Sequence, residues 1–237
     1  MFTTKAKLNG YILERFKSPI DGQSCVAILT LNSANRKTGD MAQVWILRED
    51  VNPVAAIASG DDYSICGHCP HRVNIETGNR SCYVNVGQAP LAVWKAYKAG
   101  KYGKLSDLHP AFLAGKNIRW GAYGDPAILS NSLFQTINEA AKKHTGYTHQ
   151  WRAQFAQPFK NYLMASVDSF AEYLEASSNG WKCFSVTPPG KVGQGKLCPA
   201  TVENSKSKCQ TCLLCDGAKV DVFVEAHGRG KKYVKTY

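Results

Sequence analysis

Seven of the nine cysteines in this 237-residue chain fall into two groups whose spacing suits metal binding. In the C-terminal group, Cys198-Pro199 is followed by Cys209-Gln210-Thr211-Cys212-Leu213-Leu214-Cys215. Two consecutive two-residue gaps put three thiols on one tight turn, and the fourth thiol arrives from a ten-residue loop. Four thiolates can complete a tetrahedral zinc site or hold the corners of a [4Fe–4S] cluster. The CxxCxxC pattern favours the cluster, because structural zinc sites more often pair two separate CxxC knuckles. We therefore predict cluster ligands at Cys198, Cys209, Cys212 and Cys215.

The N-terminal group, Cys66, Cys69 and Cys82, has only three thiols and leaves several interpretations open. His68 or His71 could complete a zinc site with three cysteines and one histidine. An iron–sulfur cluster could instead keep one iron open for a substrate or a cofactor. Proline directly follows Cys69, as it follows Cys198, and favours a cluster because it supplies no competing backbone donor.

The remaining two cysteines, Cys25 and Cys183, lie in apolar, strand-like runs. Either could supply a fourth thiolate to the N-terminal group, since distance in sequence does not prevent it. Buried cysteines in strands more often pack as small hydrophobic residues. We therefore expect both to lie in the core.

The elements that must position these thiols alternate between strands and helices in the second half of the chain. Such alternation through short loops predicts parallel strands with crossover helices, and thus an α/β fold, either a partial barrel or an open sheet. An N-terminal strand pair is expected at 25–31 and 43–48, and later strands at 117–123, 147–151, 162–167, 182–186 and 220–224. Helices are expected at 53–58, 90–98, 107–113, from Pro126 to near His144, 153–159 and 169–176.

Polar residues at the carboxyl ends of these strands are the candidates for binding a cofactor, because ligands collect there in α/β folds. The candidates are Asp125, Arg152 and Asp168, and Arg119 and His149 could also bind an anionic group. Each aspartate also stands where it could cap the next helix. Arg152 could equally form a surface ion pair.

Length and composition limit the class of protein. The chain can form one domain with a core of ordinary size, and its 44% hydrophobic residues exclude disorder as the dominant state. No apolar run approaches the roughly 18 residues of a membrane span, and the opening MFTTKAKLNG lacks the apolar stretch of a signal peptide. We expect a cytoplasmic protein, in which clustered cysteines bind metal rather than form disulfides. The net charge of +11 would allow a nucleic-acid partner.

The expected organisation is a single domain over residues 1–237 with five segments. They are the N-terminal strands and short helix (1–60), the first cysteine loop (61–88), the βα units (89–190), the C-terminal cysteine cluster with the last strand (191–227) and a basic tail (228–237).

The order of these features resembles a group of phage-encoded cysteine-rich proteins that are similar to radical S-adenosylmethionine (radical SAM) enzymes. The resemblance runs from about Trp45 to Cys215 and is most specific in SICGHCPHR at 64–72, in SCYVNVG at 81–87 and in the final four cysteines. It implies a partial βα-barrel with a three-cysteine cluster near its mouth and a fully ligated second cluster after the last strand. In radical SAM enzymes the three-thiolate cluster binds S-adenosylmethionine at its open iron and reduces it to release a 5′-deoxyadenosyl radical. In this chain the usual CxxxCxxC is replaced by CxxC, with the third cysteine twelve residues later.

Two functions follow as competing expectations. The first is an iron–sulfur protein with a radical-SAM-like barrel and one or two [4Fe–4S] clusters, acting on a small molecule or a protein redox partner. It would be an oxidoreductase or a lyase using S-adenosylmethionine, or a non-catalytic cluster protein. If phage-encoded, it would work in the host bacterial cytoplasm, away from membranes. The second is a zinc-stabilised module whose basic surface binds nucleic acid.

Overall fold

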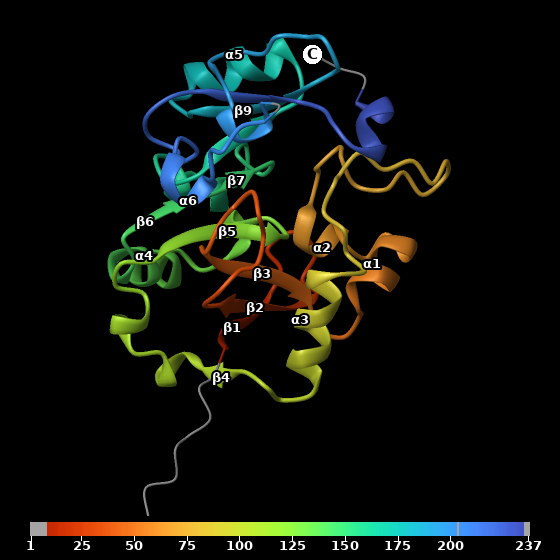
Figure 1. Cartoon of the computed structure of the whole chain (residues 1–237). Coiled ribbons are helices and arrows are strands. Elements are labelled where there is room, and N and C mark those ends of the chain that lie inside the picture. The colour runs from red at the N-terminus through yellow and green to blue at the C-terminus, as the bar shows by residue number, and fades with distance from the viewer. Residues whose placement is uncertain (1–8, 203, 235–237) are drawn as a thin grey trace, which may run out of the picture.

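The computed structural model describes residues 9–202 and 204–234 and is a mixed α/β fold (Figure 1). Its first sheet has the strand order β4-β1-β2-β3-β5-β6, and its second has the order β10-β11-β9-β8-β7. The first sheet contains β1 (Gly10–Lys17), β2 (Ser24–Thr30), β3 (Ala42–Arg48), β4 (Gly103–Lys104), β5 (Asn117–Tyr123) and β6 (Lys143–Thr145). The second contains β7 (Tyr147–Thr148), β8 (Met164–Val167), β9 (Cys183–Thr187), β10 (Lys196–Leu197) and β11 (Val222–Glu225).

The expected N-terminal strand pair is confirmed as β2 and β3, which run antiparallel in a register from Cys25 opposite Arg48 to Thr30 opposite Gln43. Both strands are almost wholly buried, because they lie inside the sheet and are covered on both faces. The sequence analysis did not predict β1, which pairs with the outer side of β2. Its Tyr11 and Leu13 are buried while Arg15 and Lys17, at the same two-residue spacing, are exposed, and the register with β2 shifts between Ile12 and Glu14. The strand therefore lacks the regular two-residue alternation that would have identified it.

The remaining strand pairs from β3 onward are parallel, as the alternation of strands and helices predicts. In the first sheet β3 pairs with β5 and β5 with β6, and in the second β7, β8, β9, β11 and β10 pair in that order. Only Gly146 separates β6 from β7, so the two sheets follow one another along the same stretch of chain. A Cβ at position 146 would lie 2.5 Å from the Leu163 side chain and 3.0 Å from that of Trp120. Glycine is therefore needed at the junction of the two sheets.

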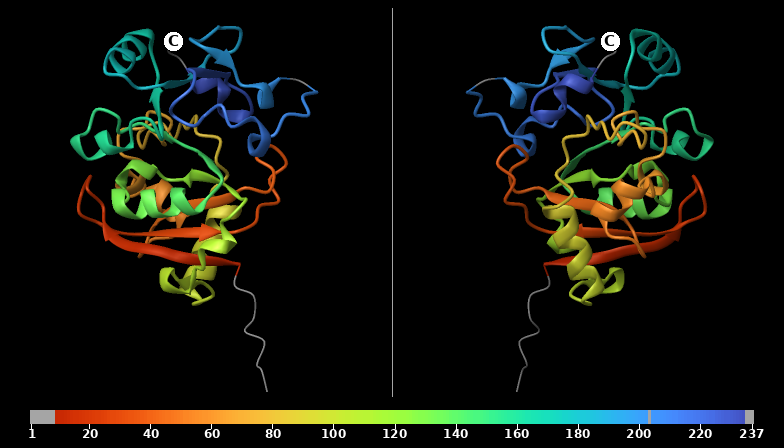
Figure 2. Two further views of the ribbon diagram at one scale, coloured as in Figure 1. Left: turned by 90° about the vertical axis from the view of Figure 1, so that its left-hand side faces the viewer. Right: turned by 90° about the vertical axis from the view of Figure 1, so that its right-hand side faces the viewer.

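Six α-helices are found in the described residues, and they are grouped by the sheet that they cover. Helices α1, α2 and α3 all contact β3, and α5 contacts β8 and β9 at the other end of the molecule (Figures 1 and 2). Their bounds are α1 Pro53–Ser59, α2 Tyr63–Cys66, α3 Ala89–Lys98, α4 Asn131–Ala140, α5 Phe170–Ser178 and α6 Cys209–Cys212. Helix α1 ends as predicted at Gly60, whose φ of 83° suits glycine.

Two predicted helices are wrong in extent. The pattern from Pro126 to His144 is a 3₁₀ turn at Pro126–Ile128, then α4, then β6, because Leu129 and Ser130 are extended and break the helix. The helix expected from Asp107 to Leu113 is replaced by two 3₁₀ turns, Leu105–Asp107 and Pro110–Phe112. Pro110 holds the preceding residue extended, and this prevents a continuous helix.

The core is centred on aromatic residues that join α4 to β5. The Phe134 ring lies 4.3 Å from the Trp120 ring and 5.0 Å from the Phe159 ring, measured between centroids, and all three side chains are fully buried. Within the part of the chain that the structure describes, no helix has the length and apolar composition of a membrane span.

Most of the opening segment tested for a signal peptide lies outside the described residues, as do the last three residues of the basic tail. The described part of that tail forms a 3₁₀ turn at Arg229–Tyr233. Its Gly230 packs against the first cysteine loop, because a Cβ there would lie 3.0 Å from the Ser81 carbonyl oxygen.

Candidate metal centre in the main cavity

A cavity of about 180 Å³, here called the main cavity, lies between the first cysteine loop and the parallel strands. Residues between Asp62 and Val84 form one wall, and side chains from β5, β7, β8 and β9 form the other. Asp125, His149 and Asp168, which follow the carboxyl ends of β5, β7 and β8, also line it. The cavity therefore lies at the carboxyl ends of the parallel strands, where the sequence predicts polar residues that could bind a ligand.

Cys66, Cys69 and Cys82 all line the main cavity. Burial raises the pKa of Cys66 well above its ordinary value, and the neighbouring Cys69, Asp62 and Cys82 raise it further. Burial also raises the pKa of Cys82. Arg80 acts against this increase, and Cys69 adds to it. The three thiols are thus close enough to interact electrostatically, and a metal centre would take the place of their protons.

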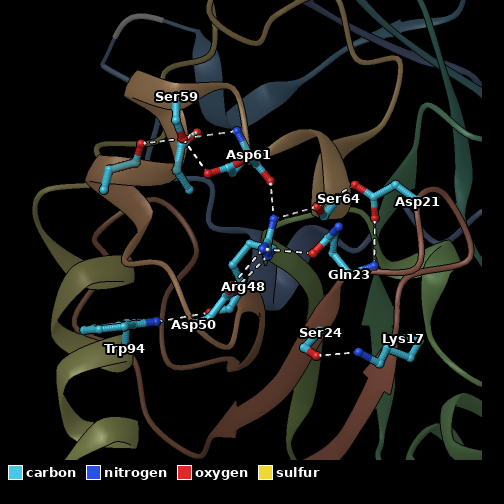
Figure 3. Close-up of polar contacts among 12 residues, drawn as sticks. Lys17, Asp21, Gln23, Ser24, Arg48, Asp50, Ser59, Asp61, Ser64 and Trp94 are labelled. Atoms are coloured by element: carbon cyan, nitrogen blue, oxygen red, sulfur yellow. Dashed lines mark hydrogen bonds and ion pairs between the residues drawn. The ribbon is translucent and has the colours of Figure 1, made fainter.

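A polar network at the end of β3 reaches Ser64, which precedes Cys66 by two residues (Figure 3). Arg48, whose side chain is only 6% exposed, donates to Ser64 Oγ over 3.0 Å and pairs with Asp50 over 2.9 Å. Ser64 in turn donates to Asp21 Oδ2 over 2.7 Å. The network ties the short helix α2, which ends at Cys66, to the carboxyl end of β3 in the first sheet.

The turn after Cys66 is held from both sides. Gly67 has a φ of 54°, and Gln150 donates from its side chain to the Cys66 carbonyl oxygen over 3.1 Å. Arg72 pairs with the buried Asp62 over 2.6 Å and also donates to the Gly60 carbonyl oxygen over 2.7 Å. These contacts fix the backbone that carries Cys66 and Cys69.

Cys82 returns to this turn through a main-chain hydrogen bond from its N–H to the His71 carbonyl oxygen, over 2.9 Å. Ser81 Oγ lies 2.8 Å from Nδ1 of the same histidine. The third thiol is therefore brought to the other two by contacts between neighbouring loop residues.

The C-terminal cysteine set, Cys198, Cys209, Cys212 and Cys215, is attached to both sheets. The Cys209 N–H donates to the Lys37 carbonyl oxygen over 3.0 Å, so the loop after β2 touches the segment with α6, as Figure 2 shows in orange-red and blue. Cys198 donates from its N–H to Phe223 on β11 over 2.8 Å, and the Cys215 carbonyl oxygen accepts from Gly146 over 3.1 Å.

The four thiols of this set also influence one another. Burial raises the pKa of Cys215 to about 12; a hydrogen bond from Tyr147 acts against this, while Cys198, Cys209 and Cys212 add to it. Burial likewise raises the pKa of Cys198 and Cys209. In residues 9–202 and 204–234, however, neither set brings three thiol sulfurs within 4.8 Å of one another. A zinc ion with Zn–S bonds of about 2.3 Å would require closer sulfurs, whereas each thiolate of a cubane binds a different iron and stands further from the others.

Two tyrosines lie between the sets. Tyr83, which is 59% exposed in the open main cavity, is within electrostatic range of Cys82 on one side and of Cys198 and Cys209 on the other. Tyr147 lines the cavity from β7, and its hydroxyl contacts Cys215. Cysteines of both sets are therefore within electrostatic range of Tyr83, although only the N-terminal set lines the main cavity.

His71, His149 and Asp168 form a second group of possible ligands in the same cavity. The Nε2 atoms of His71 and His149 lie 3.1 and 3.3 Å from the Asp168 carboxylate oxygens. Burial alone would raise the pKa of Asp168, but the two imidazoles hold it below its usual range. Burial would lower the pKa of His149, but Cys69 and Asp168 raise it well above its usual range.

The two aspartates predicted from the sequence, Asp125 and Asp168, both line the main cavity, but Asp125 binds main-chain N–H groups and Asp168 faces two histidines. Asp125 caps the turn at Pro126–Ile128 as predicted, accepting from Ala127 N over 3.0 Å and from His149 N over 2.8 Å. Both of its oxygens are therefore used to hold the wall of the cavity. The prediction that Asp168 caps a helix is wrong: Ser169 caps α5 by accepting from Glu172 N, which leaves the Asp168 carboxylate facing the histidines.

Arg152 is not among the residues that line the main cavity. It pairs with Glu172 over 3.0 Å and with Glu175 over 2.6 Å, and its guanidinium lies over the Trp151 ring. About half of its side chain is exposed. The structure thus gives Arg152 the surface ion pair that was the alternative to cofactor binding.

Cys25 and Cys183 are 0% and 2% exposed and belong to the packed core, as expected. Of the two histidines suggested as zinc ligands, His71 lines the main cavity, whereas His68 lies beside the Tyr63 hydroxyl at 3.3 Å. Arg80 and Tyr147 were not singled out from the sequence, whereas Gln150 lies at a strand end expected to bind substrate and Ser81 begins the segment 81–87. Arg80 stands two residues before Cys82, and that proximity was the available signal.

The function of this protein has to be inferred from the main cavity and the two cysteine sets, because comparisons with known proteins gave no match. No family model, no curated protein and no solved structure matches this chain.

Proposed function

We propose that this protein binds two [4Fe–4S] clusters, one at each cysteine set, and that the cluster at Cys66, Cys69 and Cys82 presents an open iron to the main cavity. The observation that carries the proposal is that three thiols, and no fourth from the described residues, line one cavity of about 180 Å³. A cluster with three thiolates keeps one iron available for a ligand. The cavity would admit that ligand from solvent.

The separation of the thiols supports clusters over zinc. Neither set gathers its sulfurs closely enough for one tetrahedral ion in the described residues, although each set is electrostatically coupled. A larger inorganic centre does not require the sulfurs to meet so closely, because each of its irons takes one thiolate. The CxxCxxC pattern at Cys209, Cys212 and Cys215 points the same way.

Nearby guanidinium groups also support this assignment. A [4Fe–4S]²⁺ centre carries about −2 with four thiolates and about −1 with three. Arg119 lies within electrostatic range of Cys209, and Arg80 within range of Cys82. Neither arginine has an ion-pair partner among residues 9–202 and 204–234, so each is available to offset the charge of a cluster.

The succession of parallel strands from β3 to β11 is compatible with a partial βα-barrel of the radical-SAM type, and we propose this as the finer description of the fold. In such an enzyme, the open iron would bind S-adenosylmethionine and supply a 5′-deoxyadenosyl radical. This chain's residues would enclose the ligand between the cysteine loop and the strand ends, where Tyr123 and Asp125 form part of the wall.

Anaerobic purification followed by iron and sulfide analysis tests the cluster assignment. We expect a brown protein with about eight irons per chain, as two [4Fe–4S] clusters require. Cys212→Ser and Cys69→Ser should each remove one cluster, whereas Cys183→Ala, a core substitution, should keep both. A colourless protein that retains zinc would overturn the proposal and favour the zinc-stabilised alternative.

The open iron is tested separately by adding S-adenosylmethionine to the reduced protein. We expect a change in the electron paramagnetic resonance spectrum of one cluster and formation of 5′-deoxyadenosine. Both signals should be lost in Cys69→Ser and kept in Cys183→Ala. An unchanged spectrum with intact clusters would exclude the radical-SAM function while leaving cluster binding in place.

A further inference from the structure

We infer that His71, His149 and Asp168 form a binding site for one divalent transition-metal ion, separate from the cysteine sets. The three residues come from the first cysteine loop and from the ends of β7 and β8. They share the main cavity with Cys69 but contribute no thiolate. The inference goes beyond cluster binding and does not depend on it.

The spacing of the three side chains fits a single ion. One ligand atom from each residue lies within 4.8 Å of the others, and the two Nε2-to-carboxylate distances are 3.1 and 3.3 Å. Ligands bound at about 2.0–2.2 Å stand roughly 3.0–3.5 Å apart in octahedral or tetrahedral geometry. Each imidazole nitrogen therefore stands from one Asp168 oxygen at the separation of neighbouring ligands, His71 from Oδ1 and His149 from Oδ2, and small movements would bring all three residues onto one ion.

The two histidine nitrogens lack well-formed partners in the structure. Both Nε2 atoms are buried, yet neither makes a hydrogen bond of acceptable angle, although each is within ion-pair distance of Asp168. A buried polar atom without a hydrogen bond is unfavourable. A cation placed between the two nitrogens and the carboxylate would satisfy all three residues.

Each residue is also oriented by a second contact, as metal ligands commonly are. Ser81 Oγ lies 2.8 Å from His71 Nδ1, which leaves Nε2 free for a metal. The main-chain N–H of His149 donates to Asp125 over 2.8 Å, and that of Asp168 to Glu172 over 2.8 Å. The contacts hold the site without using its ligand atoms.

The donor set indicates the kind of metal. Two imidazoles and one carboxylate suit Fe²⁺, Mn²⁺, Co²⁺ or Zn²⁺, and leave positions open for water or substrate. Those positions would face the main cavity, which all three residues line. The alternative is an ion pair between protonated histidine and Asp168, which needs no metal, and the experiment must separate the two.

Mn²⁺ is the probe, because it prefers nitrogen and oxygen ligands and binds thiolates weakly. Titrations of the full-length protein, followed by the loss of the free-ion electron paramagnetic resonance signal, should show one bound Mn²⁺ per chain. Asp168→Asn and His71→Ala should lower the affinity at least tenfold. Ser81→Ala removes only an orienting contact, so it should lower the affinity by about tenfold and by less than either ligand substitution.

His68→Ala is the matched control, since this histidine belongs to the same loop but not to the triad, and its Mn²⁺ affinity should equal that of wild type. The Cys66→Ser/Cys82→Ser variant should still bind Mn²⁺, which separates this site from the N-terminal cluster. Circular dichroism would confirm that near-isosteric Asp168→Asn remains folded. No binding by wild type at millimolar Mn²⁺, or equal binding by Asp168→Asn, would overturn the metal site in favour of the ion pair.

Discussion

The side-chain amide of Gln150 donates a hydrogen bond to the carbonyl oxygen of Cys66 over 3.1 Å. The two residues are 84 positions apart in the chain, and Gln150 is only 4% exposed. The contact joins the end of β7 to the first cysteine loop at Gly67, where a Cβ would lie 2.5 Å from the Gln150 amide. The position of Cys66 therefore depends on a glycine beside it.

Gly67→Ala should displace either Gln150 or the Cys66 backbone and lower the occupancy of the N-terminal cluster. Iron analysis should give a loss approaching one cluster, with the C-terminal cluster retained. Gly78→Ala is the matched control, because Gly78 also has a positive φ, 67°, but has nothing within 4 Å of the added Cβ. Equal iron content in the two variants would contradict the positioning role of this contact.

Arg48→Met should destabilise the fold, because it removes several hydrogen bonds from a buried guanidinium at the end of β3. We expect the free energy of unfolding to fall by about 2–3 kcal/mol. Arg15→Met should cost less than about 1 kcal/mol, because the Arg15–Glu49 pair is on the surface, with Arg15 55% exposed. Denaturant unfolding of the metal-free wild type and of both variants measures these changes. Equal losses of unfolding free energy in Arg48→Met and Arg15→Met would contradict the importance of the network in Figure 3.

Stability should fall at alkaline pH, in part through Cys25. Burial raises the pKa of Cys25 from 9.0 to about 12 in the folded chain. The buried thiol therefore contributes stability fully below about pH 9, and this contribution is lost as pH rises toward 12 because the unfolded chain deprotonates first. The maximum slope for one such group is about 1.4 kcal/mol per pH unit.

Cys25→Ala isolates this effect from the titration of lysines and tyrosines. Its unfolding free energy at pH 8 should be lower than that of wild type, because a packed side chain is shortened. Its further decline between pH 9 and pH 11 should be shallower. Parallel curves for the two proteins would show that Cys25 does not titrate on unfolding.

Arg119→Met should make the reduction potential of the C-terminal cluster more negative, because loss of a nearby positive charge disfavours the added electron. Arg119 lies within electrostatic range of Cys209. Arg152→Met is the control, since Glu172 and Glu175 already neutralise its charge at the surface. Redox titration followed by electron paramagnetic resonance measures both, and an unchanged potential in Arg119→Met would contradict the proposed charge compensation.

Several features could be predicted because their signals are local. Pro53 and Gly60 bound helix α1, and apolar runs identify β2 and β3. The alternation of strands and helices predicts the parallel order, which the structure confirms. The helix expected after Pro126 was too long, because β6 forms only by pairing with β5, and that contact lies outside any local pattern.

By itself, the sequence determined which cysteines could act together, since ligands two residues apart share one turn wherever that turn is placed. It also placed Asp125 and Asp168 at strand ends. Only the tertiary structure decided that Asp168 faces His71 and His149 while Asp125 binds backbone, and that Arg152 turns to the surface. The physical reason is that side-chain direction at a strand end depends on the neighbouring strand and helix. His71 and Asp168, almost 100 positions apart, meet only when the first cysteine loop packs against the end of β8.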